Sequence, residues 1–229
     1  MTHDQFCGYN FLIFFSENCK FFSKTVTDYR GLVSNKLMEA KGDAFYISEV
    51  LRGNPESFAP LVDKYKQLAF SLALKITRNR EDAEEIAQDA FLKAYRSLEN
   101  FKGSATFKTW LFRIVYTTAI SRVRGKKQSF VSFDDYKLSE SELMETENAV
   151  GQLTAEERSY QLHKAMESLA PDERAVLNLY YFEDQSVDEI ATILDISASN
   201  VKIKLFRSRK KLYGQLHRLL KIEDAYVLQ

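Results

Sequence analysis

Residues 186–212 read SVDEIATILDISASNVKIKLFRSRKKL, and this stretch decides the fold class. Ser186 followed three residues later by Glu189 is the pattern of a capping box at the start of a helix. Apolar residues follow on one face of a short helix, the run 195–197 breaks it, and a second helix opens near Ala198. Length and pattern together predict a helix-turn-helix.

The two sides of the second helix differ in chemistry. At 3.6 residues per turn, one side is apolar or small and is expected to face the core: Val201, Leu205, Ser208, Leu212 and Leu216. The other side suits a recognition helix, with base edges read by Ser199, Lys202, Ile203 and Arg207. Phosphates are expected to meet Asn200, Arg209, Lys210 and Lys211. Phe206 lies on this side too, and either packs against a neighbouring helix or contacts a thymine methyl or the sugar backbone.

Upstream of this motif, helical periodicity begins at about Glu49. Asn54-Pro55 resembles an N-cap followed by proline at the first helical position. Asn79 is expected to cap a second helix whose first turn is acidic, as the helix dipole favours. A third helix is expected from Phe107 to about Gly125. These patterns predict an all-α protein.

The chain divides by composition into five parts. We expect an N-terminal extension (1–48), a helical domain (49–128), a flexible acidic linker (129–158), a second helical domain (159–222) and a short tail (223–229). The extension is either a poorly ordered tail or an over-extended reading frame whose physiological start is Met38.

Net charge is zero, yet two segments, 101–128 and 196–221, carry basic residues and no acid. Lysine and arginine often only solvate helix faces, but two such segments beside a reading motif favour two contacts with DNA. An enzyme is not expected, because the three histidines are scattered and no phosphate-binding loop, nucleophile elbow or zinc pattern occurs.

The two cysteines, Cys7 and Cys19, match no ligand pair for a metal and fit a reducing cytoplasm better than a disulfide framework. The apolar run at residues 11–15 is far shorter than the ~20 residues of a membrane span, so no membrane insertion is expected.

Three stretches resemble the sigma-70 family of RNA polymerase sigma factors. Residues 169–174 (LAPDER), with the helix-turn-helix, resemble sigma region four, which reads the −35 promoter element. Residues 82–91 (DAEEIAQDAF) with Ala94-Tyr95 resemble the region-two helix that docks on the polymerase β′ clamp helices. Residues 101–103 and 109–114 resemble the part that engages and melts the −10 element. The resemblance covers about 50–128 and 158–221, and the short linker is typical of the extracytoplasmic-function (ECF) subfamily.

The resemblance implies sites in the first helical domain. Core polymerase would bind Asp82, Glu85, Ile86, Gln88, Asp89, Phe91 and Tyr95. The −10 element would bind Asn100, Phe101, Lys102, Thr106, Lys108, Arg113, Thr117, Arg124 and Lys126. The loop 100–106 is the expected pocket for a flipped base, and Trp110 is expected in the core. Thr117 stands where the family usually carries Asn, which alters the base preference at that contact.

The resemblance also implies partners: core polymerase through the β′ clamp helices and the β flap, promoter DNA, and an anti-sigma factor. It implies no cofactor, metal or small-molecule substrate, and a cytoplasmic location. A conventional helix-turn-helix regulator that binds operators as a dimer is the rival interpretation. It explains residues 160–221 but gives no role to the 82–95 helix or to the first basic segment.

Overall fold

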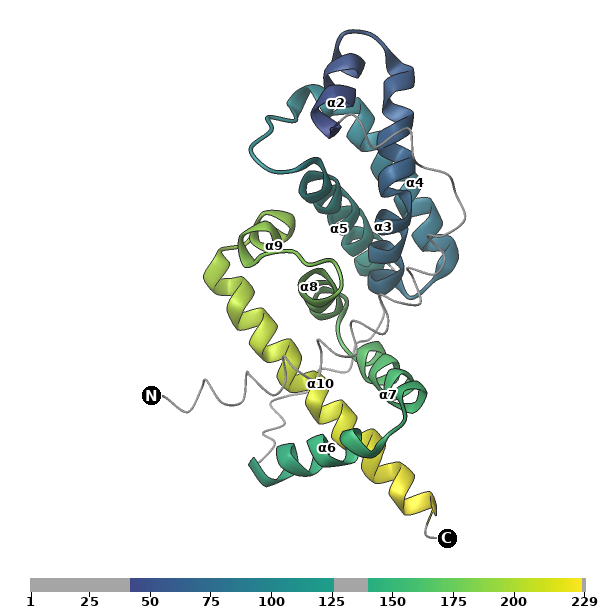
Figure 1. The fold of residues 1–229 in the computed structure, drawn as a ribbon, viewed down its shortest axis with the longest axis vertical. Helices are drawn as coiled ribbons and strands as arrows, with labels where there is room; N and C mark the ends of the chain where they lie inside the picture. The colour runs from purple at the N-terminus through teal and green to yellow at the C-terminus, as the bar shows by residue number, and fades with distance from the viewer. Residues whose placement is uncertain (1–41, 126–139, 228–229) are drawn as a thin grey trace.

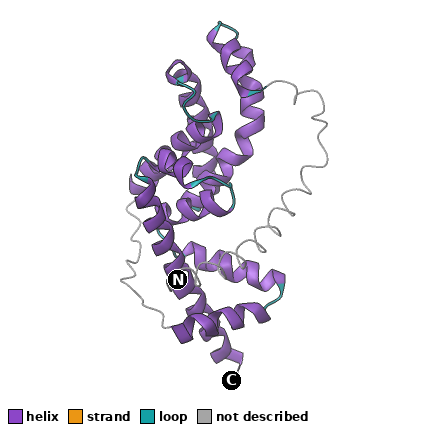
Figure 2. Cartoon of the chain, turned by 60° about the vertical axis from the view of Figure 1, so that its left-hand side comes forward, coloured by secondary structure: helices purple, strands orange, loops and turns teal. Residues whose placement is uncertain are grey.

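The structure is a computed structural model that describes residues 42–125 and 140–227. All regular structure in these two ranges is helical (Figure 2). The N-terminal unit contains α2 (Asp43–Leu51), η2 (Pro55–Phe58), α3 (Ala59–Thr77), α4 (Arg80–Arg96), η3 (Leu98–Asn100) and α5 (Phe107–Gly125). The C-terminal unit contains α6 (Glu140–Gln152), α7 (Ala155–Glu167), α8 (Pro171–Tyr181), α9 (Val187–Leu194) and α10 (Ala198–Val227). None of the helices in the described ranges has the length and apolarity needed to span a membrane.

The core of the N-terminal unit lies between α3, α4 and α5, which pack against one another. Large side chains from all three are fully buried: Leu61, Leu72, Ile76, Ile86, Phe107, Leu111 and Phe112. Burying each contributes about 1.5–3 kcal/mol, which stabilises the bundle. Asn79 caps α4 as expected, because its side chain accepts a hydrogen bond of 2.8 Å from the backbone N–H of Asp82.

The N-terminal unit begins earlier than the sequence indicated. Helix α2 starts at Asp43, whose carboxylate accepts hydrogen bonds of 2.6 Å from Lys64 Nζ and from the Tyr65 hydroxyl. Asn54 makes no side-chain cap, and residues 55–58 form a 3₁₀ turn before α3. Pro60 supplies no N–H and so fits the first turn of α3, which begins at Ala59. The alternative start at Met38 lies outside the described residues.

The helix-turn-helix is confirmed in the C-terminal unit. The N–H of Ser186 donates to Glu189 (2.9 Å), and the N–H of Glu189 donates to the Ser186 hydroxyl (3.2 Å), which completes the capping box of α9. Asp195 ends α9 in the left-handed conformation at φ 60°. The five residues expected to face the core are 0–2 % exposed: Val201, Leu205, Ser208, Leu212 and Leu216.

Part of the segment expected to be a linker is helical. Helix α6 packs against α10, and Thr146 on α6 is buried at 2.7 Å from Nδ1 of His217. Helix α7 follows after Thr154, which forms a second capping box with Glu157. Helix α10 continues to Val227, five residues beyond the expected end of the domain. The C-terminal unit therefore extends at both ends.

The two units lie directly against each other (Figure 1). Helix α8 packs on α3, and α9 packs on α5. Their buried residues belong to one continuous hydrophobic cluster. The first helix of the helix-turn-helix thus faces the helix expected to contact the −10 element.

Candidate nucleic-acid interface

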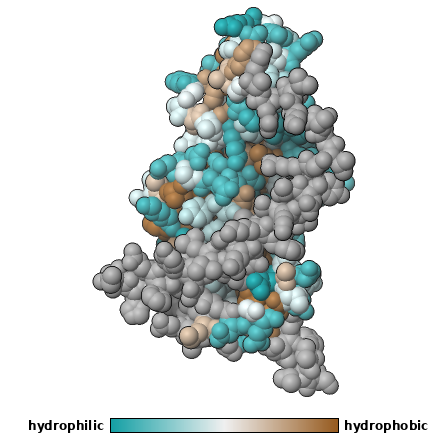
Figure 3. Space-filling model, in the orientation of Figure 1, coloured by the Kyte–Doolittle hydropathy of each residue, from teal (hydrophilic) through white to brown (hydrophobic). Residues whose placement is uncertain are grey.

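The N-terminal half of α10 presents the expected reading surface to solvent. Ile203 and Phe206 are 48 % and 64 % exposed, although both are large and apolar. Ser199, Asn200, Lys202 and Arg207 are exposed beside them. Figure 3 shows hydrophobic atoms next to hydrophilic ones around this end of α10. Phe206 is therefore not buried against a neighbouring helix, and its contact with DNA stays a prediction.

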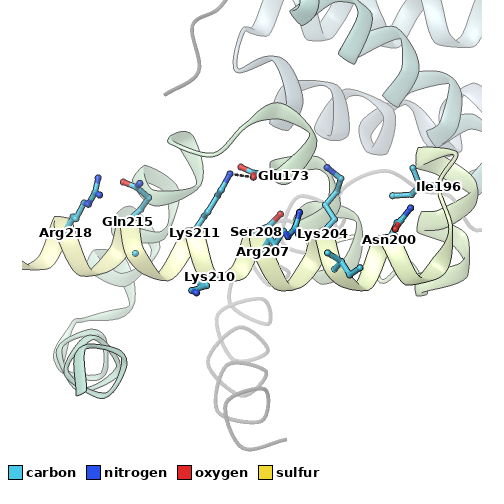
Figure 4. Close-up of a pocket in the computed structure, with 12 residues that line it drawn as sticks. Glu173, Ile196, Asn200, Lys204, Arg207, Ser208, Lys210, Lys211, Gln215 and Arg218 are labelled. Atoms are coloured by element: carbon cyan, nitrogen blue, oxygen red, sulfur yellow. Dashed lines mark hydrogen bonds and ion pairs between the residues drawn. The ribbon is translucent and has the colours of Figure 1, made fainter. Parts of the chain in front are cut away.

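A groove of about 450 Å³ runs along one side of α10 (Figure 4). Its basic lining comes from Lys204, Arg207, Lys210, Lys211 and Arg218, and its acid is Glu173 of α8. Lys211 Nζ lies 2.5 Å from the Glu173 carboxylate, and Lys204 pairs with Asp172. These pairs anchor two lysines, and Arg207 stays exposed, so the groove has the charge that suits a phosphate backbone.

Arg209 differs from the other residues expected to contact phosphates. Its Nε donates to the carbonyl of Leu205 at 3.2 Å, one turn back along α10, and its side chain is half-buried. Lys210 and Lys211 are half-buried as well. The most accessible of the residues expected to contact DNA therefore lie in the first half of α10.

The expected −10 surface begins at the N-terminus of α5. Thr106 caps this helix, because its hydroxyl accepts a hydrogen bond of 3.1 Å from the N–H of Thr109. The Thr117 hydroxyl donates to the carbonyl of Arg113 at 2.9 Å and stays exposed. Asn100, Lys102 and Arg124 are exposed too, and Lys126 lies outside the described residues.

Three aromatic rings hold the loop before α5. The ring of Phe101 lies 5.2 Å from that of Trp110 and 6.0 Å from that of Phe107. Phe107 is buried, whereas Phe101 and Trp110 are partly exposed. Trp110 thus packs against the core, as expected, and stays partly exposed. Gly103 takes φ 70°, a conformation that glycine adopts at no steric cost.

Two basic residues of the −10 surface are engaged by the C-terminal unit. Lys108 Nζ donates to the Glu183 carbonyl (2.9 Å) and lies 3.8 Å from its carboxylate. Arg113 pairs with Asp195 at 3.1 Å. Burial raises the pKa of Glu183 to about 7, and the charge of Lys108 opposes this rise. This part of α5 is therefore covered in the structure.

Three residues of the expected polymerase-docking face of α4 lie on its buried side. Ile86 (0 % exposed), Phe91 and Asp82 (8 % each) face the core, and their role in binding polymerase stays a prediction. The apolar stripe of α4 packs on α3 and α5, and this stripe contains Ile86 and Phe91. The Asp82 carboxylate instead lies 3.4 Å from Arg122 Nη1 of α5.

The accessible face of α4 contains a residue that the motif did not indicate. Leu92 is 53 % exposed and Tyr95 is 42 % exposed. Gln88 and Glu85 are exposed on the same side, at helical spacing, and Asp89 is half-buried. The sequence could have indicated Leu92, because an apolar residue opposite the core stripe of an amphipathic helix suits an interface.

Comparison with known proteins gives this geometry a context. The model of sigma-70 region 2 matches residues 61–129, and the model of sigma-70 region 4 matches residues 159–212. The RNA polymerase sigma-H factor of Pseudomonas aeruginosa is 31 % identical over 191 residues, which are 81 % of this chain and 99 % of the relative. The ECF RNA polymerase sigma factor SigW of Bacillus subtilis is 31 % identical over 76 % of this chain and 96 % of its own length.

A solved structure shares the fold. It is described as CnrH in complex with the cytosolic domain of CnrY, and it is similar at a TM-score of 0.51 and 23 % identity, over 76 % of this chain and 96 % of that one. The two family matches fall on the two helical units, in the order expected from the sequence. The chain therefore belongs to the ECF subfamily of sigma-70 RNA polymerase sigma factors, which direct transcription initiation at promoters.

Proposed function

We propose that region 2 of this chain (residues 49–128) binds core polymerase and opens the −10 element, while region 4 (residues 159–222) reads the −35 element as duplex. The observation that carries this proposal is the exposed reading surface of α10. Ile203 and Phe206 are exposed to water beside basic residues. An exposed apolar surface of this kind on a helix-turn-helix is typical of a site that binds another molecule.

At the −35 element, α10 enters the major groove with its first half. Lys202 and Arg207 supply donors for guanine edges, Ser199 is a short polar contact, and Ile203 and Phe206 meet thymine methyls. The groove along α10 lies along the DNA backbone, so that Asn200, Lys210 and Lys211 are near phosphates. Arg209 contributes charge from a half-buried position.

At the −10 element, the loop 100–106 receives the flipped base. Exposed Asn100 and Lys102 flank the turn at Gly103, and the partly exposed rings of Phe101 and Trp110 give a stacking surface. Holding an unpaired base offsets an unstacking cost of a few kcal/mol, so no ATP is required. Further contacts to the strand come from Thr106, Lys108, Arg113, Thr117, Arg124 and Lys126.

Core polymerase meets α4 through its β′ clamp helices. The docking face consists of Glu85, Gln88, Asp89, Leu92 and Tyr95. Leu92 and Tyr95 form its apolar centre and the charged residues its rim, the usual arrangement of an interface. Region 4 meets the β flap, and the family resemblance supports this second contact.

The protein acts by binding, without catalysis or a cofactor, in the cytoplasm where polymerase works. The structural neighbour CnrH was solved with the cytosolic domain of CnrY. We extend that relation to this chain, with an anti-sigma factor as its regulator.

Co-purification tests the polymerase contact. Leu92→Ala is expected to weaken binding to core polymerase roughly tenfold, as truncation of a central apolar residue does. Leu51→Ala is the matched control, because Leu51 is 50 % exposed on α2 and belongs to no proposed contact, so its truncation should leave binding unchanged. Equal binding by both variants would exclude this face. Tight binding of duplex operator DNA as a dimer, without polymerase, would favour the conventional regulator.

A further inference from the structure

We propose that Asp172 and Glu173, at the start of α8, are positioning residues that limit how strongly region 4 holds the DNA backbone. Their carboxylates hold the ammonium groups of Lys204 and Lys211 on α10 and neutralise charge that would otherwise bind phosphates. A smaller share of the affinity then comes from contacts that every sequence offers. This inference rests on the proposed function, because it matters only when α10 binds DNA.

The sequence of the reading helix by itself overstates its charge. Residues 196–221 carry basic side chains and no acid, which alone would favour binding to any stretch of DNA. The acids come from another helix, since the first turn of α8 carries Asp172 and Glu173. Helix α8 packs on α10, so both carboxylates reach the basic helix from its side.

Glu173 is held by its own helix as well as by α10. Its Oε2 accepts a hydrogen bond of 3.0 Å from the backbone N–H of Ala170. Its Oε1 accepts from Lys211 Nζ at 2.5 Å, and Figure 4 shows the lysine side chain reaching from α10 towards α8. The Glu173 side chain is 12 % exposed, so salt and water screen this pair little.

The second pair lies two turns earlier on α10. Lys204 Nζ donates to the Asp172 carboxylate, and both residues are only partly exposed. Lys204 and Lys211 are seven residues apart and therefore lie on the same side of the helix. Ser208, between them, is fully buried, and its small side chain allows close packing of α8 on α10. The side of α10 that faces α8 thus carries two ion pairs.

The reading side of the same helix differs. Lys202 and Arg207 are exposed to solvent there, beside the exposed apolar residues of the reading surface. Lys204 and Lys211, by contrast, direct their ammonium groups to carboxylates of α8. Helix α10 therefore has one set of cations directed to solvent and one set held by its neighbour.

A lysine that is already paired with a carboxylate adds little to phosphate binding. The pair is neutral as a whole, so a phosphate near Lys211 has to displace the Glu173 carboxylate or accept its repulsion. Each phosphate that a protein neutralises steepens the slope of log K against log salt concentration by about 0.9. Release of both lysines is therefore expected to steepen this slope by about 1.8.

Salt-dependent binding of the holoenzyme tests the proposal. The full chain is assembled with core polymerase and titrated onto a fluorescein-labelled duplex from which this holoenzyme initiates transcription, at a temperature that keeps the duplex closed. The released variant combines Asp172→Asn and Glu173→Gln, which keep the side-chain shapes and remove the charges. Glutamine can still accept the N–H of Ala170. Between about 50 and 200 mM salt, the affinity of this variant should fall about twelvefold more than that of the original chain.

Three controls separate positioning from charge in general. On a fragment that ends downstream of the −35 element, the two slopes should agree. Glu56→Gln with Glu156→Gln removes two charges at exposed positions on η2 and α7 that belong to no proposed contact, and it should leave the slope unchanged. In a chain with Lys204→Met and Lys211→Met, the two neutral substitutions on α8 should not steepen the slope, because no lysine is left to release.

Each outcome decides the proposal. A steeper slope that needs the −35 element and both lysines supports it. An unchanged slope overturns it, and so does a shallower one, which would show that the carboxylates present the lysines to phosphates. Equal steepening in the methionine chain would mean that the carboxylates repel DNA directly, and it overturns the positioning role. If the original chain initiates on no fragment, the proposed function fails and the inference falls with it.

Circular dichroism checks that the released variant keeps its helices. If it does not, Asp172→Asn alone serves, because Asp172 is the more exposed of the two acids. The expected steepening is then about 0.9, and no steepening contradicts the proposal.

Discussion

The buried guanidinium of Arg174 makes the sharpest stability prediction. Replacing it by methionine keeps the length of the side chain but removes its hydrogen bonds to the carbonyls of Lys75 and Ile76, and to that of Leu169 at 2.5 Å. Hydrogen bonds to a charged group contribute about 1.5–3 kcal/mol each, and a buried acceptor left without a donor costs about 1–3 kcal/mol. Burial, which lowers the pKa of Arg174 to about 10, shows that desolvation offsets part of this gain. We expect Arg174→Met to lower the free energy of unfolding by about 2–4 kcal/mol.

Urea unfolding of the full chain, followed by circular dichroism, measures this loss. The free energy of unfolding of Arg174→Lys should lie between those of the original chain and of Arg174→Met, because a single ammonium cannot reproduce the planar guanidinium that donates to several carbonyls. Arg52→Met is the control: the Arg52 side chain is 74 % exposed and its removal should change little. A loss under about 1 kcal/mol for Arg174→Met would refute the reasoning, since the two carbonyls of α3 would then not depend on this guanidinium.

Three further predictions concern separate parts of the molecule. The pKa of Glu183 is raised from 4.5 to about 7 in the folded protein, so its contribution to stability is full below pH 4.5 and is lost as the pH rises through 7. This loss amounts to at most about 3 kcal/mol in the free energy of unfolding. Glu183→Gln should remove it, as thermal unfolding between pH 5 and 8 would show. Ser186→Ala should cost about 1 kcal/mol in urea unfolding, because the capping box of α9 loses its hydroxyl acceptor. Phe206→Ala should leave unfolding unchanged within about 0.5 kcal/mol, because the ring is 64 % exposed, and should reduce transcription from a cognate promoter severalfold.

The outcomes that contradict these predictions are specific. A stability difference between Glu183→Gln and the original chain that does not grow with pH would show that this carboxyl is not desolvated. An unchanged free energy of unfolding for Ser186→Ala would mean that solvent replaces the cap. A large loss of stability in Phe206→Ala would mean that the ring packs in the core after all.

Local patterns in the sequence were sufficient for the helix-turn-helix. A capping box, a break and an apolar stripe are each encoded within a few residues, so Ser186, Glu189 and the buried side of α10 were predicted and found. The polymerase face shows the opposite case. Motif likeness selected Ile86 and Phe91, which the structure buries, and did not select Leu92, which is exposed; which of them contact polymerase stays a prediction.

Some features of the fold depend on contacts between residues far apart in the sequence, and local patterns could not predict them. Helix α2 begins at Asp43 because Lys64 and Tyr65 hold its carboxylate, more than twenty residues away. Helix α6 lies in a segment whose acids favour a linker, yet it packs on α10. The contact of α8 with the end of α3 uses Arg174 and backbone carbonyls, and backbone carbonyls leave no side-chain pattern in the sequence.

Run-off transcription tests the central claim most directly. The purified chain is added to core polymerase on a library of genomic fragments from the same organism, and transcripts are mapped. We expect initiation at a small set of fragments that depends on the chain and is lost when Lys202 and Arg207 on α10 are both changed to alanine. No chain-dependent initiation on any fragment, with polymerase active under another sigma factor, would contradict the account.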